Sequence, residues 1–154
     1  MKIYLVRHAE AVPLSGSGDC ARHLTARGRK RFRRNVEMLL EKGPAPRTIL
    51  TSPFVRAVQT AELLARHAGY SGEVHACTAI ADEVSADDLH AMLRRWGKRL
   101  FVVGHEPSLS LLVAQVTGTQ AVPFPKGGIA ALDVKPDGTG RLEWMIMDGK
   151  LKRP

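Results

Sequence analysis

An apolar run that ends in an arginine and a histidine is the strongest chemical signal in this sequence: Leu5-Val6-Arg7-His8. A guanidinium can donate hydrogen bonds to two oxygens of a phosphate group, and a neutral imidazole beside it can attack the phosphorus atom. The pair is therefore suited to phosphoryl transfer. Arg-His pairs also occur by chance in surface loops, so the meaning of this pair depends on which residues the fold brings to it.

The elements that must position this pair follow from the periodicity of the chain. Four short apolar runs with strand character alternate with stretches of helical period, which begin after Thr25, after Pro53, after Ser85 and near Ser108. This alternation predicts parallel strands joined by crossover helices. The four predicted strands are Lys2 to Val6, Thr48 to Thr51, Glu73 to Cys77 and Leu100 to Val103.

The end of the chain has a different pattern. Two apolar runs, Ile129 to Val134 and Leu142 to Met147, flank a turn rich in Gly, Pro and Asp, and they predict a closing hairpin with one antiparallel strand. With 154 residues the chain is too short to expect two domains, so we expect one domain over 1–154. The predicted fold class is α/β, a three-layer α/β/α sandwich with a mostly parallel central sheet.

Polar side chains follow each of the four predicted strands, at the edge where open α/β sheets bind ligands. This edge would collect two histidines, two arginines and an acid. Arg7, Arg56 and a protonated His105 could neutralise the charge on a phosphoryl group in transit. His8 then fits as the nucleophile, which forms a phosphohistidine that water hydrolyses. The residues expected at this edge are Arg7, His8, Ser52, Arg56, Asp82, Glu83, Gly104 and His105.

Other phosphatase chemistries leave signatures that this chain lacks. Neither Cys20 nor Cys77 has an arginine six residues later, and the sequence contains no Asp-x-Asp and no Gly-x-x-x-x-Gly-Lys. The remaining histidines show no spacing typical of a metal site. The sequence therefore predicts neither a metal nor another cofactor.

Four segments in this order resemble the histidine phosphatase superfamily, whose fold is phosphoglycerate mutase-like, and in particular its small SixA-like phosphohistidine phosphatase branch. The resemblance implies that His8 is phosphorylated, that Arg7 and Arg56 clamp phosphate, and that His105 is the second histidine of the pocket. Arg22 is implied at the pocket entrance. The segments are Leu5-Val-Arg-His-Ala-Glu10, Leu24-Thr-Ala-Arg-Gly28, Ser52-Pro-Phe-Val-Arg-Ala-Val-Gln-Thr-Ala61 and Val103-Gly-His-Glu-Pro107.

The chain departs from this pattern at two positions. Ala9 replaces a glycine of the wider superfamily, a change common in this branch. Glu106 stands where the branch often has asparagine. Its charge could favour the imidazolium form of His105 or discourage an anionic substrate.

The leaving group separates the two candidate reactions. Imidazole, with a pKa of about 6.5, leaves far more readily than an alkoxide, so a phosphohistidine substrate needs little or no general acid. The sequence predicts a metal-independent phosphohistidine phosphatase that acts on proteins. The alternative is a phosphomonoesterase for sugar phosphates or similar small esters, with Glu83 as general acid. Glu83 can equally be a solvated residue before a helix. A mutase is disfavoured because the chain has no long segment that could form a lid.

The net charge is +8, and much of it comes from a run without acids between positions 22 and 34. This run is either a solvated face or a surface for an acidic partner. It gives weak support for nucleic-acid binding, because Phe32 is its only aromatic residue. A non-catalytic binding module is the third possible function. The two distant cysteines, the absence of a signal-like apolar start and the absence of a membrane-spanning run predict a cytoplasmic protein without membrane contact. The cations of the run are Arg22, Arg27, Arg29, Lys30, Arg31, Arg33 and Arg34.

Overall fold

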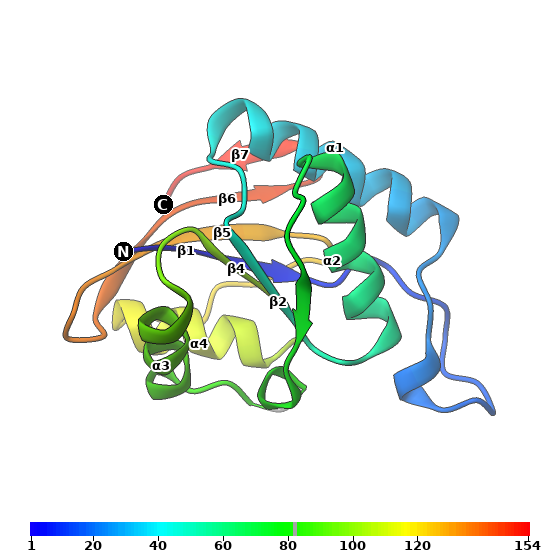
Figure 1. The fold of residues 1–154 in the computed structure, drawn as a ribbon, viewed down its shortest axis with the longest axis horizontal. Coiled ribbons are helices and arrows are strands. Elements are labelled where there is room, and N and C mark those ends of the chain that lie inside the picture. The colour runs from blue at the N-terminus through cyan, green and yellow to red at the C-terminus, as the bar shows by residue number, and fades with distance from the viewer. Residues whose placement is uncertain (82) are drawn as a thin grey trace.

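Strands and helices alternate along the chain in the order that the periodicity predicts (Figure 1). The structure is a computed structural model that describes residues 1–81 and 83–154. Its strands are β1 (Lys2–Arg7), β2 (Thr48–Thr51), β3 (Val74–Ala76), β4 (Leu100–Gly104), β5 (Ile129–Val134), β6 (Gly140–Met147) and β7 (Lys150–Lys152). Its α-helices are α1 (Ala26–Lys42), α2 (Val55–His67), α3 (Ala86–Trp96) and α4 (Ser108–Thr117), with short 3₁₀ helices η1 (Asp19–Ala21) and η2 (Thr78–Ile80).

The described strands form one sheet in the order β3-β2-β4-β1-β5-β6-β7. Strands β1 to β4 run parallel, as predicted. The predicted hairpin has one strand antiparallel to β1, as expected: β5 runs against β1, and β6 runs back in the direction of β1. Strand β7 was not predicted, and it adds a second antiparallel strand. Strand β7 follows a turn in which Asp148 and Gly149 both have positive φ, the geometry of a tight hairpin. Its three residues, Lys-Leu-Lys, are too short and too charged to show a strand pattern.

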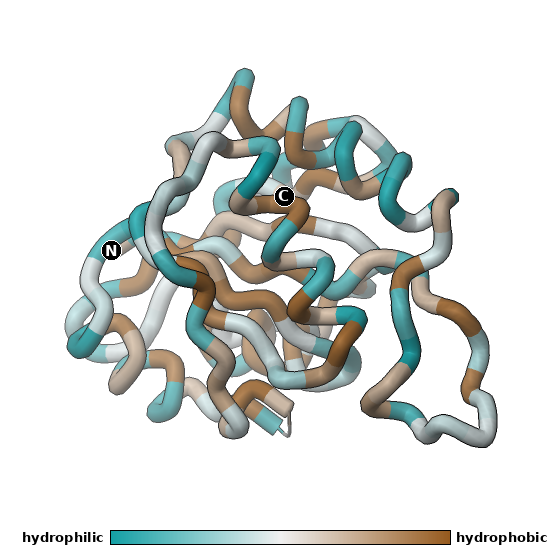
Figure 2. Tube along the Cα trace, turned by 45° about the vertical axis from the view of Figure 1, so that its right-hand side comes forward, coloured by the Kyte–Doolittle hydropathy of each residue, from teal (hydrophilic) through white to brown (hydrophobic). Residues whose placement is uncertain are grey.

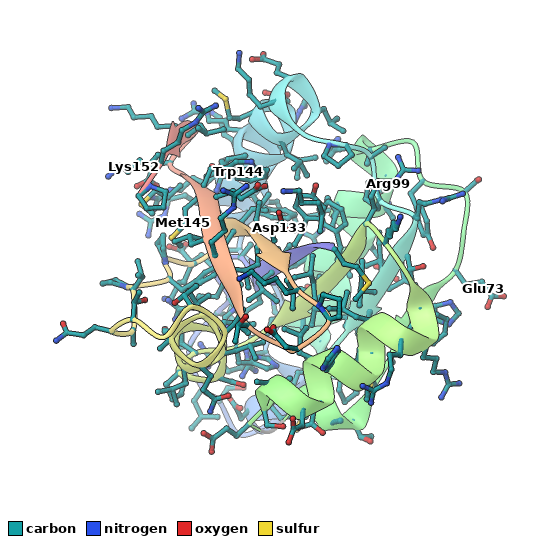
Figure 3. All side chains as sticks on the ribbon, turned by 90° about the vertical axis from the view of Figure 1, so that its left-hand side faces the viewer. Glu73, Arg99, Asp133, Trp144, Met145 and Lys152 are labelled. Atoms are coloured by element: carbon teal, nitrogen blue, oxygen red, sulfur yellow. The ribbon has the colours of Figure 1, made fainter. Side chains whose placement is uncertain are left out.

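Two layers of helices cover the sheet, which confirms the three-layer α/β/α architecture (Figure 1). Residues of β1 alternate between the layers: Tyr4 and Val6 pack with α1 and α2, whereas Ile3 and Leu5 pack with α3 and α4. Apolar residues accordingly gather along the strands at the centre of the molecule (Figure 2). The same alternation continues in β6, where Trp144 and Met145 contact opposite layers (Figure 3).

Side-chain caps fix where two of the helices begin. The Thr25 hydroxyl accepts the Gly28 N–H at 2.9 Å, and Ser85 forms a reciprocal capping box with Asp88. Both caps are at the predicted positions. Within the described residues, no helix has the length and apolar character needed to cross a membrane.

Candidate active site

The segments that follow β1, β2 and β4 are joined by backbone hydrogen bonds at the carboxyl edge of the sheet. The His8 N–H donates to the Gly104 carbonyl and the Ser52 N–H donates to the Val103 carbonyl, each at 3.0 Å. These bonds bring the rings of His8 and His105 to 5.2 Å between centroids. The fold thus places both predicted histidines in one site.

His8 is buried and held in one tautomer. Its Nδ1 lies 2.7 Å from the Ala9 carbonyl, and only a protonated Nδ1 can donate to that oxygen. The lone pair of Nε2 is then free. The pKa of His8 is lowered to about 3, mainly by burial and also by the nearby His105, Arg56 and Arg7, while the hydrogen bond to Ala9 opposes this shift. At neutral pH this ring is therefore uncharged, as a nucleophile must be.

The loop that carries His8 is fixed to α2. The Ala9 N–H donates to the Thr60 hydroxyl at 3.0 Å, and that hydroxyl donates to the Arg56 carbonyl at 2.7 Å. Thr60 is fully buried. This chain of bonds fixes the position of His8 relative to the helix that carries Arg56.

His105 is positioned by Ser52, a fully buried residue directly after β2. The Ser52 Oγ lies 2.7 Å from Nε2 of His105 and accepts the Phe54 N–H at 3.3 Å. We assign the Ser52 hydroxyl as the donor to Nε2, which places the ring proton of His105 on Nδ1.

The protonated His105 expected from the sequence is not its ligand-free state. Burial, and then the charge of Arg56, lower the pKa of His105 to about 4, while Asp19 opposes them. Its ring is therefore neutral at pH 7 in the free protein. The sequence showed that cations would be near this ring, but it could not show how deeply the ring is buried.

Arg56 is almost fully buried and turned towards a residue that the sequence analysis missed. Its Nη1 and Nη2 donate to the backbone carbonyl and to Oδ2 of Asp19, at 2.8 and 3.1 Å. Arg22 donates to the other carboxylate oxygen of Asp19 at 3.1 Å and to the Val12 carbonyl at 2.7 Å. Arg22 therefore lies at the rim, next to Arg56. No motif marks Asp19, because its role depends on how the 13–22 loop folds back.

Three side-chain nitrogens of this site are buried without a hydrogen-bond partner: Nε of Arg7, Nε of Arg56 and Nδ1 of His105. Across the described part of the chain, these are all the buried side-chain nitrogens and oxygens without a partner. An unpaired buried donor costs about 1–3 kcal/mol. Three such donors in one site, two of them from guanidinium groups, indicate a site built for an anion.

Glu83, the acid predicted near the site, lies at its edge. Glu83 is exposed and lines a pocket of about 170 Å³ together with His105 and Glu106. Asp82 lies outside the described residues. The Glu106 carboxylate accepts both the N–H and the hydroxyl of Ser110 in the first turn of α4, and its charge opposes the lowering of the Arg7 pKa by burial.

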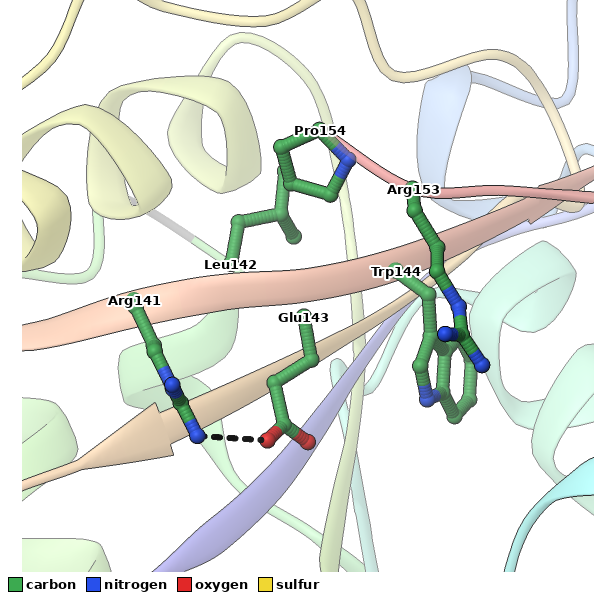
Figure 4. Close-up of a pocket in the computed structure, with 6 residues that line it drawn as sticks. All are labelled: Arg141, Leu142, Glu143, Trp144, Arg153 and Pro154. Atoms are coloured by element: carbon green, nitrogen blue, oxygen red, sulfur yellow. Dashed lines mark hydrogen bonds and ion pairs between the residues drawn. The ribbon is translucent and has the colours of Figure 1, made fainter.

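The other cavities and polar clusters do not coincide with this site. A cavity of about 580 Å³ lies along β6 and the C-terminal residues, where Arg141 pairs with Glu143 at 3.5 Å and Arg153 lies beside Trp144 (Figure 4). It is lined by none of the residues predicted to act in phosphoryl transfer. In residues 1–81 and 83–154, no group of three or more His, Cys, Asp or Glu side chains could hold a metal ion.

Known proteins share this fold and these segments. The family model of the histidine phosphatase superfamily (branch 1) matches residues 3–88. Phosphohistidine phosphatase SixA of Escherichia coli (strain K12) is 28% identical over 159 residues, 99% of this chain and 97% of the relative. A solved structure of the protein histidine phosphatase SixA complexed with tungstate has a TM-score of 0.87 at 24% identity, over 96% of this chain and 97% of that chain. A phosphoserine phosphatase from Entamoeba histolytica, solved with 3-phosphoglyceric acid, has a TM-score of 0.71 at 15% identity, over 92% and 94%.

Proposed function

This chain belongs to the histidine phosphatase superfamily (branch 1), a family of phosphatases, and we propose that it removes phosphate from phosphohistidine in proteins, with residues 1–154 acting as one domain. The observation that carries this proposal is the set of three unpartnered buried nitrogens beside a neutral His8. The similarity to SixA over nearly the whole chain supports the same substrate class.

The reaction proceeds in two displacements. Solvent protonates the free nitrogen of the substrate ring, Nε2 of His8 attacks the phosphorus atom, and the bond from phosphorus to the substrate nitrogen breaks, so that the ring leaves as neutral imidazole. Water then attacks the phosphohistidine of the enzyme, which releases inorganic phosphate and restores His8. The side chains of Arg7 and Arg56 and the Nδ1–H of His105 stabilise the charge on the three equatorial oxygens.

The positions of the carboxylates favour imidazole as the leaving group. An alcohol ester needs an acid that protonates the leaving oxygen, whereas an imidazole leaves with little or no help. Glu83 is exposed, and the Glu106 carboxylate is engaged by Ser110. Among the described residues, neither carboxylate has a hydrogen bond to His8 or His105 that would fix it in this site.

The small-ester reaction remains the alternative, because Glu83 and His105 line the same pocket and a phosphoserine phosphatase shares the fold. The variant Glu83→Gln separates the two. In a phosphohistidine phosphatase this variant keeps its turnover of a phosphohistidine peptide. In a phosphomonoesterase that uses Glu83, its turnover of sugar phosphates falls by about a hundredfold or more.

The direct test is phosphate release by the wild type and by His8→Ala. We expect release from a phosphohistidine protein in preference to a panel of sugar phosphates, and complete loss of release in His8→Ala. Preference for the sugar phosphates would favour the alternative. No release from either class would leave a binding module as the better interpretation.

The expected partner is a phosphorylated protein, and the expected compartment is the cytoplasm. Both cysteines are free in the structure, Cys20 exposed and Cys77 half-buried, which suits a reducing environment.

A further inference from the structure

A groove runs from the segment after His8 along one side of α1. One pocket, of about 280 Å³, is lined by Glu10, Arg31, Phe32, Lys126 and Asp148 among others. A second, of about 210 Å³, is lined by Arg31, Arg34 and Asp148. The two pockets share Arg31 and Asp148 and so adjoin each other, and together they are here named the α1 groove.

The α1 groove begins at the proposed catalytic site. Ala9 and Glu10, which follow His8 in the chain, line its first pocket. The opposite wall comes from the segment around Lys126, where the Gly127 N–H donates to the His8 carbonyl at 3.0 Å. The α1 groove is therefore adjacent in the fold to the segment that carries His8.

Cations outnumber acids along the α1 groove. Arg27, Arg31 and Arg34 recur at intervals of four and three residues and so share one side of α1, with Lys30 next to Arg34. Lys126 lies on the opposite wall. The groove contains two carboxylates, and each already has a cation, since Arg27 pairs with Glu10 and Arg31 with Asp148, both at 2.6 Å.

Three cations of this surface have no ion-pair partner within the part of the chain that the structure describes. They are Lys30, Arg34 and Lys126, and all three are exposed. An uncompensated positive surface beside a reaction centre attracts negatively charged molecules and speeds their encounter with the site.

We propose that the α1 groove is a docking surface for acidic segments of the protein that carries the phosphohistidine. This inference rests on the proposed function above. A protein is favoured over a nucleic acid because the groove offers no aromatic surface for base stacking: its Phe32 is completely buried. The two ion pairs on its floor and wall, Arg27–Glu10 and Arg31–Asp148, can exchange partners with incoming carboxylates.

Two synthetic peptides test the proposal. They carry the same phosphohistidine, flanked in one peptide by a run of glutamates and in the other by glutamines. We expect wild-type kcat/KM to be about tenfold higher for the glutamate peptide at low ionic strength, and this preference to shrink as salt is added.

The test variant is Arg34→Gln with Lys126→Gln, which removes two exposed charges from the groove. The matched control is Arg94→Gln with Lys98→Gln, which removes one exposed charge in α3, in the other helical layer, and one in the turn after it. We expect the groove variant to lose most of the glutamate preference and to keep the wild-type rate on the glutamine peptide. The control variant should keep both the glutamate preference and the wild-type rate on the glutamine peptide. An equal rate on the two peptides in the wild type, or an equal loss in both variants, would overturn the docking surface.

Failure of the proposed function gives a different result, because wild type would then hydrolyse neither peptide. Docking is measured independently by fluorescence anisotropy with the unphosphorylated glutamate peptide and the His8→Ala variant. Binding that weakens in the groove variant but not in the control supports the surface. If the groove variant instead weakens binding of single-stranded RNA and leaves peptide binding unchanged, the protein partner is wrong.

Discussion

Removing the Ser52 hydroxyl should impair catalysis through His105. The hydroxyl lies 2.7 Å from Nε2 of His105 and is fully buried, so Ser52→Ala leaves that nitrogen and the Phe54 N–H without their partner. Without the hydroxyl the ring can turn, and it no longer has to keep its proton on Nδ1. One hydrogen bond contributes a net of about 1 kcal/mol, and a loss of about 1.4 kcal/mol corresponds to a tenfold change in rate. A loss of about 1 kcal/mol therefore corresponds to a fall in kcat/KM for a phosphohistidine peptide of about fivefold.

The same substitution should lower the free energy of unfolding by about 1–3 kcal/mol, because it leaves a buried donor unpaired. Thr51→Val is the matched control. It removes a buried hydroxyl that donates to the Ser52 carbonyl at 3.0 Å, whereas the ring of His105 is hydrogen-bonded to Ser52. We expect this variant to lose stability but keep wild-type kcat/KM, and Ser52→Thr to restore much of the activity. Wild-type kcat/KM in Ser52→Ala, or equal losses of kcat/KM in Ser52→Ala and Thr51→Val, would refute the positioning role.

Three further predictions concern acid stability, the site charge and backbone packing. Burial lowers the pKa of His8 to about 3 and of His105 to about 4, from 6.5, so the unfolded chain binds protons that the folded chain does not. The free energy of unfolding, measured by urea denaturation, should therefore decrease as the pH falls from about 6.5 to 4, and less steeply in His8→Gln. Glu106→Gln removes a negative charge near the phosphate site and should tighten tungstate binding about threefold by calorimetry. Gly28→Ala would place a Cβ 2.3 Å from a backbone carbonyl of the loop after β1 and should cost about 1–3 kcal/mol by thermal unfolding, whereas Gly16→Ala, with no atom within 4 Å, should cost little.

Most of the fold could be predicted because its signals are local. Periodicity marks β1 to β4 and the four helices, and Thr25 and Ser85 act as caps as predicted. The motifs around Arg7, Arg56 and His105 predicted the family, which the family model confirms. Strand β7 was missed because three residues carry too little pattern, and it forms through its pairing with β6.

Features of the site that depend on contacts between distant residues could not be predicted in this way. Asp19 lies 37 positions from Arg56 in the sequence, and its bonds to that arginine exist only once the loop has folded back. The neutral state of His105 follows from burial between elements that are far apart in the chain. Sequence patterns identify which groups reach the edge of the sheet, whereas solvation and pairing at that edge are properties of the folded molecule.

Each group that the proposed mechanism directs at phosphate is held at one nitrogen by the protein and left unpartnered at another. The Arg7 Nη1 donates to the Phe124 carbonyl while Nε has no partner, and His105 is bound at Nε2 while Nδ1 has none. Arg56 follows the same pattern, with both Nη atoms on Asp19 and Nε unpartnered. In the proposed mechanism, donors fixed in this way need no reorganisation when negative charge develops on the equatorial oxygens, so they would stabilise the transition state more than a flexible site. The cost of leaving them unpaired falls on the free protein, whose two hydrophobic layers hold the strand ends in place.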